Sequence, residues 1–272
     1  MFSKYCVIVK GGGDLATGVA HKLFRAGFPV IITELEKPMM VRRNVSFANC
    51  IYEKKWTVEG VTSVLTNEEG IDKILNDRKI PVLIDPSCNI REKIKPSIIV
   101  DAILAKRNLG TRINDAPIVI GLGPGFTAGE DVNAVIETNR GHNLGKVIFC
   151  GKAAPNTGVP GDIKGFTIQR VLRSPSKGIV KNQVEIGTMV KIGDIICTVN
   201  DITVHAQIDG VVRGLIRDGL SVSFNEKIGD IDPRGELKYC NIISDKGRNI
   251  AGGVLEAILI SLGNNCHFER IG

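Results

Sequence analysis

The stretch VIVKGGGDLATG, residues 7–18, joins an apolar run to a helix-like sequence through three consecutive glycines. Gly11 and Gly13 form a G-x-G pattern, and Ala16 stands where dinucleotide-binding turns carry glycine or alanine. A turn of this kind leaves main-chain N–H groups free at the positive end of a helix, and these groups attract phosphate. The sequence therefore predicts an anion-binding turn at Gly11, Gly12 and Gly13.

Glu34 ends the next apolar run, PVIITE, and lies 21 residues after Gly13. A carboxylate at this distance binds the ribose of a dinucleotide in proteins with this type of turn. The succession of strand, turn, helix, strand and acid predicts a nucleotide site. The simpler alternatives are that the glycines only allow the strand and the helix to pack closely, and that Glu34 is a solvated strand end.

Asp14 does not fit an ordinary NAD site, because its carboxylate would repel a pyrophosphate. An acid at a helix N-terminus is favourable toward the helix dipole and can cap the free N–H groups. Asp14 is therefore a helix cap, or else the ligand is not an ordinary NAD, or Asp14 points sideways and takes part in chemistry. Lys10 precedes the glycines, but no Walker-type G-K-[ST] follows, so a phosphotransferase turn is less favoured.

A second glycine-rich turn, GLGPGFTAG, follows the apolar run APIVI. We expect Gly121, Gly123 and Gly125 to let a ligand approach the backbone closely. Thr127 and Glu130 have the spacing of a capping box, which predicts a helix over TAGEDVNAVIET. Two such turns in one parallel sheet can line a single crevice at the carboxyl ends of the strands.

Several other polar residues follow apolar runs or turn-rich stretches. Asp85 and Asp101 end strands and are expected to face the same crevice, unless they cap helices or form turns. Asn156 and Thr157 lie in GKAAPNTGVPG, which either contacts a ligand or is a plain linker between domains. His142 is the histidine best placed for a function.

No metal site is predicted. The four histidines, His21, His142, His205 and His267, lack metal-binding spacing, and none of the seven cysteines forms a CxxC pair. Neither a zinc knuckle nor a disulfide framework is therefore expected. Cysteines inside apolar runs are typical of a protein in the reducing cytoplasm.

The composition predicts an ordinary globular protein. Hydrophobic residues make up 43% of the 272-residue chain and charged residues 24%. No apolar run reaches the roughly 18 residues that a membrane span needs. The formal net charge of +6 suits small anionic ligands. Nucleic acid is not an expected partner, because basic and aromatic residues do not alternate along a common stripe.

The first half of the chain alternates strand and helix patterns, which is typical of a parallel α/β sheet. After about residue 165, short β-branched runs alternate with glycine turns, and a segment from Gly178 repeats from Gly210 with four extra residues. The repeat suggests a small closed β-sandwich with pseudo-twofold symmetry. GRNIAGGVLEAILISLG predicts a final helix that needs a partner surface for Leu255, Ile258, Leu259 and Leu262. We expect a Rossmann-like domain over 1–164, a β-rich domain over 165–240, and a helical segment over 241–272 packing on the body.

Longer motifs point to a family. GGGDLATGVAHKLFRAGF, LAKRNLGT, DAPIVIGLGPGFTAGEDVNAVIETNRGHNLG, PNTGVPG, KIGDIDPR and ISDKGRNIAGGVLEAIL resemble the YqeB family of selenium-dependent molybdenum hydroxylase system proteins, over nearly the whole chain. That family is similar to xanthine dehydrogenase accessory proteins, which carry a Rossmann-type domain and handle the molybdenum cofactor before its insertion.

The resemblance implies an accessory role in the maturation of a molybdenum hydroxylase. The implied ligand is nucleotide-bearing or a pterin phosphate such as the molybdenum cofactor, and the implied partner is the hydroxylase apoenzyme or its maturation machinery. Homo-oligomerisation is left open. The residues matching the family motifs are Gly11, Gly13, Asp14, Thr17, Asp101, Lys106, Gly121, Gly123, Gly125, Thr127, Asn156 and Thr157. Among these, Asp14, Asp101 and Lys106 are the catalytic candidates.

The repeat resembles biotinyl/lipoyl-type hammerhead or barrel-sandwich domains. A carrier domain needs a lysine in the hairpin between the two repeats, and here that hairpin reads VNDITVHAQ, without lysine. We therefore expect a scaffold or docking surface. The alternative functions are an NAD(P)-dependent oxidoreductase, which Glu34 favours, and a protein-docking scaffold without catalysis.

Overall fold

The body of the molecule is a nine-stranded, mostly parallel β-sheet with helices on both faces. The computed structural model describes residues 2–263, so Cys266 and His267 lie outside the described residues. The strand order is β10-β9-β7-β6-β1-β2-β5-β4-β3, and only the edge strands β3 and β10 run antiparallel to their neighbours. The α/β class is thus confirmed. The strands of this sheet are β1 (Val7–Lys10), β2 (Val30–Glu34), β3 (Lys55–Val58), β4 (Val61–Leu65), β5 (Ile80–Ile84), β6 (Ile98–Asp101), β7 (Ile118–Leu122), β9 (Ala134–Ile136) and β10 (Val147–Ile148).

Alternating side chains of the central strands supply two apolar layers. Val7 and Val9 of β1 face a core shared with the long helices, whereas Ile8 faces a second core on the opposite side of the sheet. Because successive strand residues point to opposite faces, a continuous apolar run such as VIV is typical of a strand buried on both sides. The helices of the body are α1 (Asp14–Arg25), α2 (Cys50–Glu53), α3 (Ile71–Asn76), α4 (Arg91–Ile94) and α5 (Asp245–Gly263).

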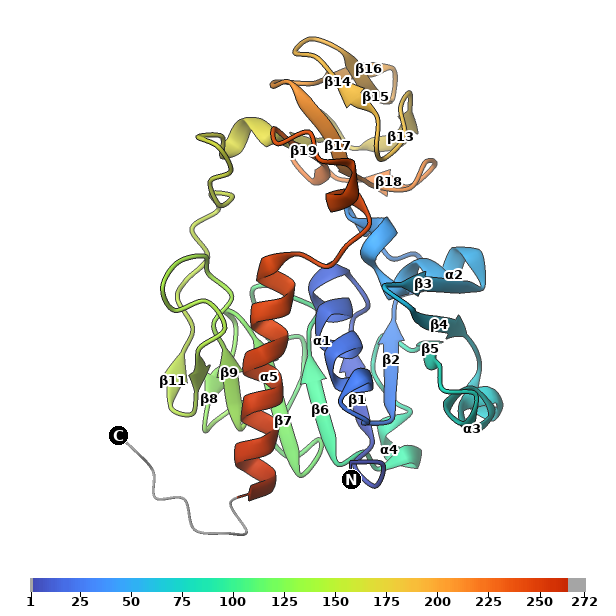
Figure 1. Ribbon diagram of the computed structural model, residues 1–272, viewed down its shortest axis with the longest axis vertical. Coiled ribbons are helices and arrows are strands. Elements are labelled where there is room, and N and C mark those ends of the chain that lie inside the picture. Colours follow the sequence, from blue (N-terminus) through green and yellow to red (C-terminus); the bar gives the residue numbers. More distant parts are fainter. Residues whose placement is uncertain (1, 264–272) are drawn as a thin grey trace.

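The predicted C-terminal helix is present as α5, which lies beside α1 and covers β7, β9 and β10 (Figure 1). Of the four residues predicted to need a partner, Ile258 is fully buried and Leu255 and Leu262 are partly buried, but Leu259 is exposed. The two helices approach closely where Gly18 meets Gly247: a Cβ on Gly18 would lie 2.9 Å from the Gly247 carbonyl oxygen.

The helix predicted over residues 127–138 is absent. This stretch forms β8 (Thr127–Ala128), a turn, and β9, and β8 pairs with β11 (Gly151–Lys152). Gly129 has φ +89°, and Asp131 accepts a hydrogen bond from the Thr127 N–H at 2.8 Å. A carboxylate that bonds back to its own turn, followed by the β-branched run of β9, outweighs the capping-box pattern.

Residues 171–232, called the β segment below, form two four-stranded sheets around their own apolar core. The sheets are β16-β15-β13-β18 and β12-β19-β17-β14, and the units exchange their short strands, because β13 pairs with β18 and β17 pairs with β14. The strands are β12 (Val171–Arg173), β13 (Gly178–Asn182), β14 (Met189–Val190), β15 (Ile195–Val199), β16 (Ile202–His205), β17 (Gly210–Leu215), β18 (Ser221–Val222) and β19 (Lys227–Asp232).

The internal repeat is structural, but the prediction of four extra residues in its second copy is wrong. Strands β13, β14 and β15 begin 32 residues before β17, β18 and β19, so the offset stays constant. The turns correspond too: Asp194 accepts from the Lys191 N–H, and Glu226 accepts from the Ser223 N–H. The recurring letters KIGDI fall in a turn in one copy and in a strand in the other.

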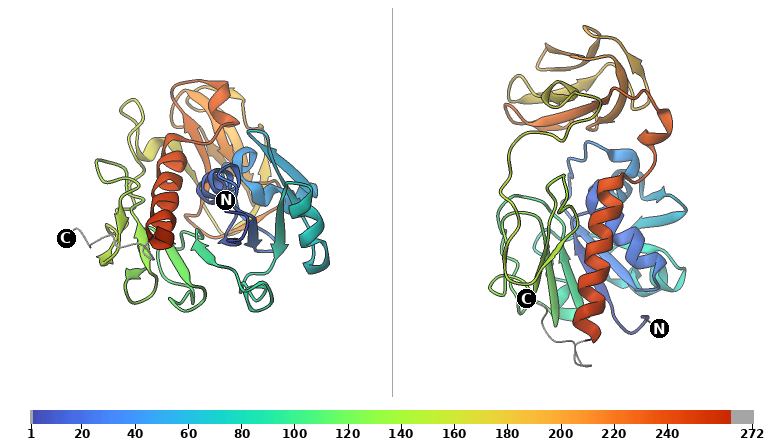
Figure 2. Two further views of the ribbon diagram at one scale, coloured as in Figure 1. Left: turned by 60° about the horizontal axis from the view of Figure 1, so that its bottom comes forward. Right: turned by 60° about the vertical axis from the view of Figure 1, so that its left-hand side comes forward.

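The β segment sits at one end of the molecule, over the N-terminal ends of α1 and α5 (Figures 1 and 2). Its main contact with the body is the stretch after β2: the Arg43 guanidinium donates to the Leu215 carbonyl at 3.1 Å, and Val41 packs against Gly214. None of the helices within residues 2–263 has the length and apolar content required to cross a membrane.

Candidate functional site

The first glycine turn is largely covered by protein. A Cβ on Gly12 would lie 2.9 Å from the Ala48 Cβ, and the Gly12 carbonyl accepts hydrogen bonds from the Ala48 N–H and the Thr17 hydroxyl. Gly11 has φ +91° and backs onto Ala102. Gly13 is the open glycine, since nothing lies within 4 Å of where its Cβ would be. Access for a ligand is therefore limited to the Gly13 end of the turn.

Glu34 holds the turn from inside. One carboxylate oxygen accepts from the Gly12 N–H at 2.8 Å, and the other accepts from the Leu35 N–H at 2.7 Å. Burial raises the pKa of Glu34, while these two hydrogen bonds oppose the rise. Thr17, predicted as a ligand contact, is fully buried and accepts from the Phe47 N–H. Both side chains thus contact the protein's own backbone.

Asp14 is the first residue of α1, not its cap. The N-cap is Gly13, and no side chain caps this end of the helix. The Asp14 carboxylate lies 3.6 Å from the Arg42 guanidinium. Arg42 is only 8% exposed, donates to the carbonyls of Tyr239 and Ile242, and leaves its Nε without a partner. Asp14 therefore supplies a counter-charge to a buried cation at the helix N-terminus.

Two lysines from distant parts of the chain lie near enough to Asp14 to be affected by its charge. Lys227 comes from β19 of the β segment, and Lys246 comes from the first turn of α5. Lys227 is exposed at the start of β19, and Lys246 is half-buried. Loss of hydration lowers the pKa of each lysine; the charges of Asp230 and Asp14 oppose this at Lys227, whereas at Lys246 the charge of Arg140 adds to the lowering and that of Asp14 opposes it. Among residues 2–263 neither Nζ has a hydrogen-bond or ion-pair partner. We call Asp14, Arg42, Lys227 and Lys246 the junction cluster.

A buried ion network supports the junction cluster from the β segment. Asp230 accepts from Arg170 and Arg213, and Asp232 accepts from Arg213 and Arg234. Both aspartates are almost fully buried, and they alternate along β19 so that they share one face of the strand. On the body side, Arg140 forms two hydrogen bonds to Asp245, which lowers the pKa of that carboxylate. These basic residues are thus paired, whereas Lys227 and Lys246 are not.

The glycines of the second glycine turn are closely packed against other parts of the chain. A Cβ on Gly121 would meet the Phe126 ring at 2.5 Å, and one on Gly123 would meet the Thr138 hydroxyl at 2.4 Å. A Cβ on Gly125 would lie 2.7 Å from the Arg107 backbone. Each glycine is therefore explained by packing within the chain, and the adjoining Thr127 donates its N–H to Asp131.

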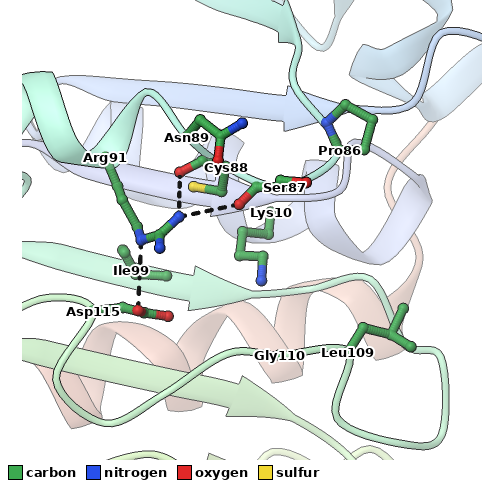
Figure 3. Close-up of a pocket in the computed structure, with 10 residues that line it drawn as sticks. All are labelled: Lys10, Pro86, Ser87, Cys88, Asn89, Arg91, Ile99, Leu109, Gly110 and Asp115. Carbon is green, nitrogen blue, oxygen red and sulfur yellow. Dashed lines mark hydrogen bonds and ion pairs between the residues drawn. The ribbon is translucent and has the colours of Figure 1, made fainter.

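A second polar group lies on the other face of the sheet, at the carboxyl ends of β1 and β6. Lys10 is 7% exposed, donates to the Thr111 hydroxyl, and lies 3.3 Å from the Asp101 carboxylate. Lys10 lines a cavity of about 270 Å³ together with Arg91 and Asp115 (Figure 3). The sequence predicted a single crevice, but these residues and the junction cluster occupy opposite faces.

The other candidates are scattered. Lys106 is exposed and has φ +63°, and Asn156 and Thr157 are exposed in the connection that leads to the β segment. Asp85 accepts from the Ile90 N–H, as expected of a turn residue. The histidines that the structure describes lie apart, with His21 buried against the Glu59 carbonyl and His142 beside α5. Within residues 2–263, no three histidine, cysteine or acidic side chains converge to hold a metal ion.

Comparison with known proteins supports the resemblance to YqeB. No family model matches the chain. The chain is 51% identical over 255 residues to the protein named YqeB of Escherichia coli K12. The aligned region covers 93% of this chain and 47% of YqeB. The chain thus spans about half the length of that relative.

Solved structures add nothing to this relationship. A product-bound ectoine utilization protein EutE from Ruegeria pomeroyi is 9% identical, with 84% of this chain and 85% of that chain covered and a TM-score of 0.26. An aspartoacylase family protein from Mesorhizobium loti is 24% identical over 23% of this chain and 22% of its own, with a TM-score of 0.22. Scores this low carry no argument about fold or chemistry.

Proposed function

We propose that this chain is an accessory protein for the maturation of selenium-dependent molybdenum hydroxylases, and that it binds a phosphate-bearing ligand at the junction cluster. The ligand class is a nucleotide or a pterin phosphate such as the molybdenum cofactor. The main support for a phosphate-bearing ligand is that two unpaired lysines, Lys227 and Lys246, lie near the N-terminus of α1, which has no side-chain cap. The biological role rests on the resemblance of the sequence motifs to the YqeB family.

The physical case for a phosphate rests on donors that lack acceptors. The first N–H groups of α1 have no side-chain cap, and Gly13 leaves their approach open. A phosphate would accept hydrogen bonds from them and pair with the ammonium groups of Lys227 and Lys246. Arg42 offsets the repulsion from Asp14. If the phosphate of a cofactor binds here, the rest of the cofactor would extend along the junction.

The proposal extends to architecture and partners. We assign the body to the Rossmann-like class and the β segment to a relative of biotinyl/lipoyl-type domains that serves as a scaffold. The hydroxylase apoenzyme or its maturation machinery is the proposed partner, in the cytoplasm. Lys227 links the β segment to the ligand, so a bound ligand would hold the scaffold in one position against the body.

An NAD(P)-dependent oxidoreductase is the second candidate. The order of strand, glycine turn, helix and acid favours it. The positions of Glu34 and Ala48 weigh against it. The Glu34 carboxylate accepts hydrogen bonds from two main-chain N–H groups, and Ala48 packs directly on Gly12. Glu34 would have to leave these bonds to reach a ribose.

The test compares two double variants in cells that need the partner hydroxylase. Lys227→Gln with Lys246→Gln should reduce hydroxylase activity at least about tenfold, since two charge-assisted hydrogen bonds are lost. Lys177→Gln with Lys181→Gln is the matched control, because both lysines are exposed on the β segment and neither belongs to the junction cluster. Native mass spectrometry of the purified chain should show a phosphorylated ligand that is lost only in the first variant. Equal activity in both variants would refute the proposed function.

A further inference from the structure

The cavity beside Lys10 lies where open α/β sheets bind ligands. After β1 the chain builds β2 and β5 on one side, then crosses to add β6 and β7 on the other. The switch point is therefore between β1 and β6, and ligands bind at the carboxyl ends of the strands flanking such a point. The lining includes Lys10 at the end of β1, Ile99 of β6, and residues 86–89 and Arg91 after β5.

This cavity is separate from the junction cluster. Lys10 and Asp101 lie on the face of the sheet that carries Ile8 and Ile99, whereas α1 covers the face that carries Val9 and Val100. The sheet itself stands between the two sites. A ligand at the junction therefore leaves the cavity free.

Lys10 offers the cavity a buried donor. Its ammonium has three N–H groups. In the described chain the Thr111 hydroxyl and the Asp101 carboxylate account for two of them. The Asp101 carboxylate has further partners, because it also accepts hydrogen bonds from the Thr111 hydroxyl and the Ile103 N–H. Figure 3 shows Lys10 reaching between residues 86–91 and the Leu109–Gly110 turn.

The remaining lining selects for a small negatively charged ligand. Lys10 and Arg91 are its cations and Asp115 is its anion; Asp101, which lies 3.3 Å from the Lys10 ammonium, is not part of the lining. Arg91 is held in place by the carbonyls of Ser87 and Cys88 and by Asp115 at 3.5 Å (Figure 3). A volume of about 270 Å³ is below that of a site for a drug-sized molecule.

We propose that this cavity binds a small oxyanion, a carboxylate or phosphate whose oxygen accepts the third N–H of Lys10 while Arg91 supplies the second positive charge. Leu109 and Ile99 form the apolar wall against which the rest of a small organic anion lies. The site is thus a second anion site of the molecule, and it does not depend on the ligand proposed for the junction.

The test uses calorimetric titration with two probes, succinate and inorganic phosphate. The titrated protein carries Lys227→Gln and Lys246→Gln, so that anion binding at the junction cluster does not contribute to the heat. The probe that binds identifies the class of oxyanion. Leu109→Glu should weaken its binding at least tenfold, because a carboxylate at the wall repels the anion; Leu109 is half exposed, so folding is spared. Ile103→Glu, on the same connection and exposed but outside the lining, should leave binding unchanged.

Removal of Lys10 itself provides a second measurement. Lys10→Met should abolish binding in a protein that circular dichroism shows to be folded. If this variant unfolds because Asp101 has lost its cationic partner, the Leu109→Glu result decides. The proposal is overturned if neither probe binds at millimolar concentration, or if Leu109→Glu and Ile103→Glu weaken binding equally. None of these outcomes bears on the junction, which is tested separately.

Discussion

At the scale of single residues, the sequence identified Asp14, one of the four residues of the junction cluster. The glycine turn and Asp14 stood out because three glycines and an acid interrupt an apolar strand and a helix. Lys227 and Lys246 could not be found in this way, because only the tertiary fold brings β19 and α5 to the N-terminus of α1. The one local signal was the alternation of Asp230 and Asp232 in GDID, which places two acids on one face of a strand.

The lowered pKa values of the two lysines predict how binding depends on pH. Sulfate serves as the probe, because its charge stays constant over the range. Its affinity should be full while both ammonium groups are protonated, and should fall as pH rises through their lowered pKa values, below the usual value of about 10.4. Lys227→Arg should move the fall to higher pH, since a guanidinium stays charged. Calorimetric titrations from neutral to alkaline pH measure both curves; identical curves would contradict a role for Lys227.

At the scale of elements, strands were easier to predict than the helix after the second glycine turn. Continuous apolar runs such as VIV and PSIIV specify buried strands whatever surrounds them. The region from Thr127 to Thr138 carried both a capping-box pattern and a β-branched run. The hydrogen bond from the Thr127 N–H to Asp131 decided in favour of a turn between two strands.

The contact between α1 and α5 gives a stability prediction with opposite signs at two glycines. Gly18→Ala should destabilise the protein by about 1–3 kcal/mol, because the new Cβ would lie 2.9 Å from a backbone carbonyl and force the helices apart. Gly252→Ala should stabilise it by about 0.5–1 kcal/mol, since its Cβ would meet only the flexible end of Lys22 at 3.6 Å and alanine favours a helix.

Urea denaturation of both variants measures these changes in the free energy of unfolding. A stabilising effect of Gly18→Ala would show that α1 and α5 are not in close backbone contact.

At the scale of the whole molecule, the junction cluster is built from both parts of the chain. The body contributes the N-terminus of α1, Arg42 and Lys246, and the β segment contributes Lys227. Direct contacts such as the Arg217–Glu53 ion pair and the Arg43 bond to Leu215 already join the two parts. The proposed ligand at the junction would add a bridge between them, so its binding would be coupled to the position of the β segment.

A calorimetric titration with inorganic pyrophosphate tests whether the junction cluster binds phosphate. The unaltered chain should bind the probe, the Lys177→Gln, Lys181→Gln control should bind it equally well, and the Lys227→Gln, Lys246→Gln variant should bind it at least about tenfold more weakly. Pyrophosphate binding that is the same in all three proteins would contradict the claim.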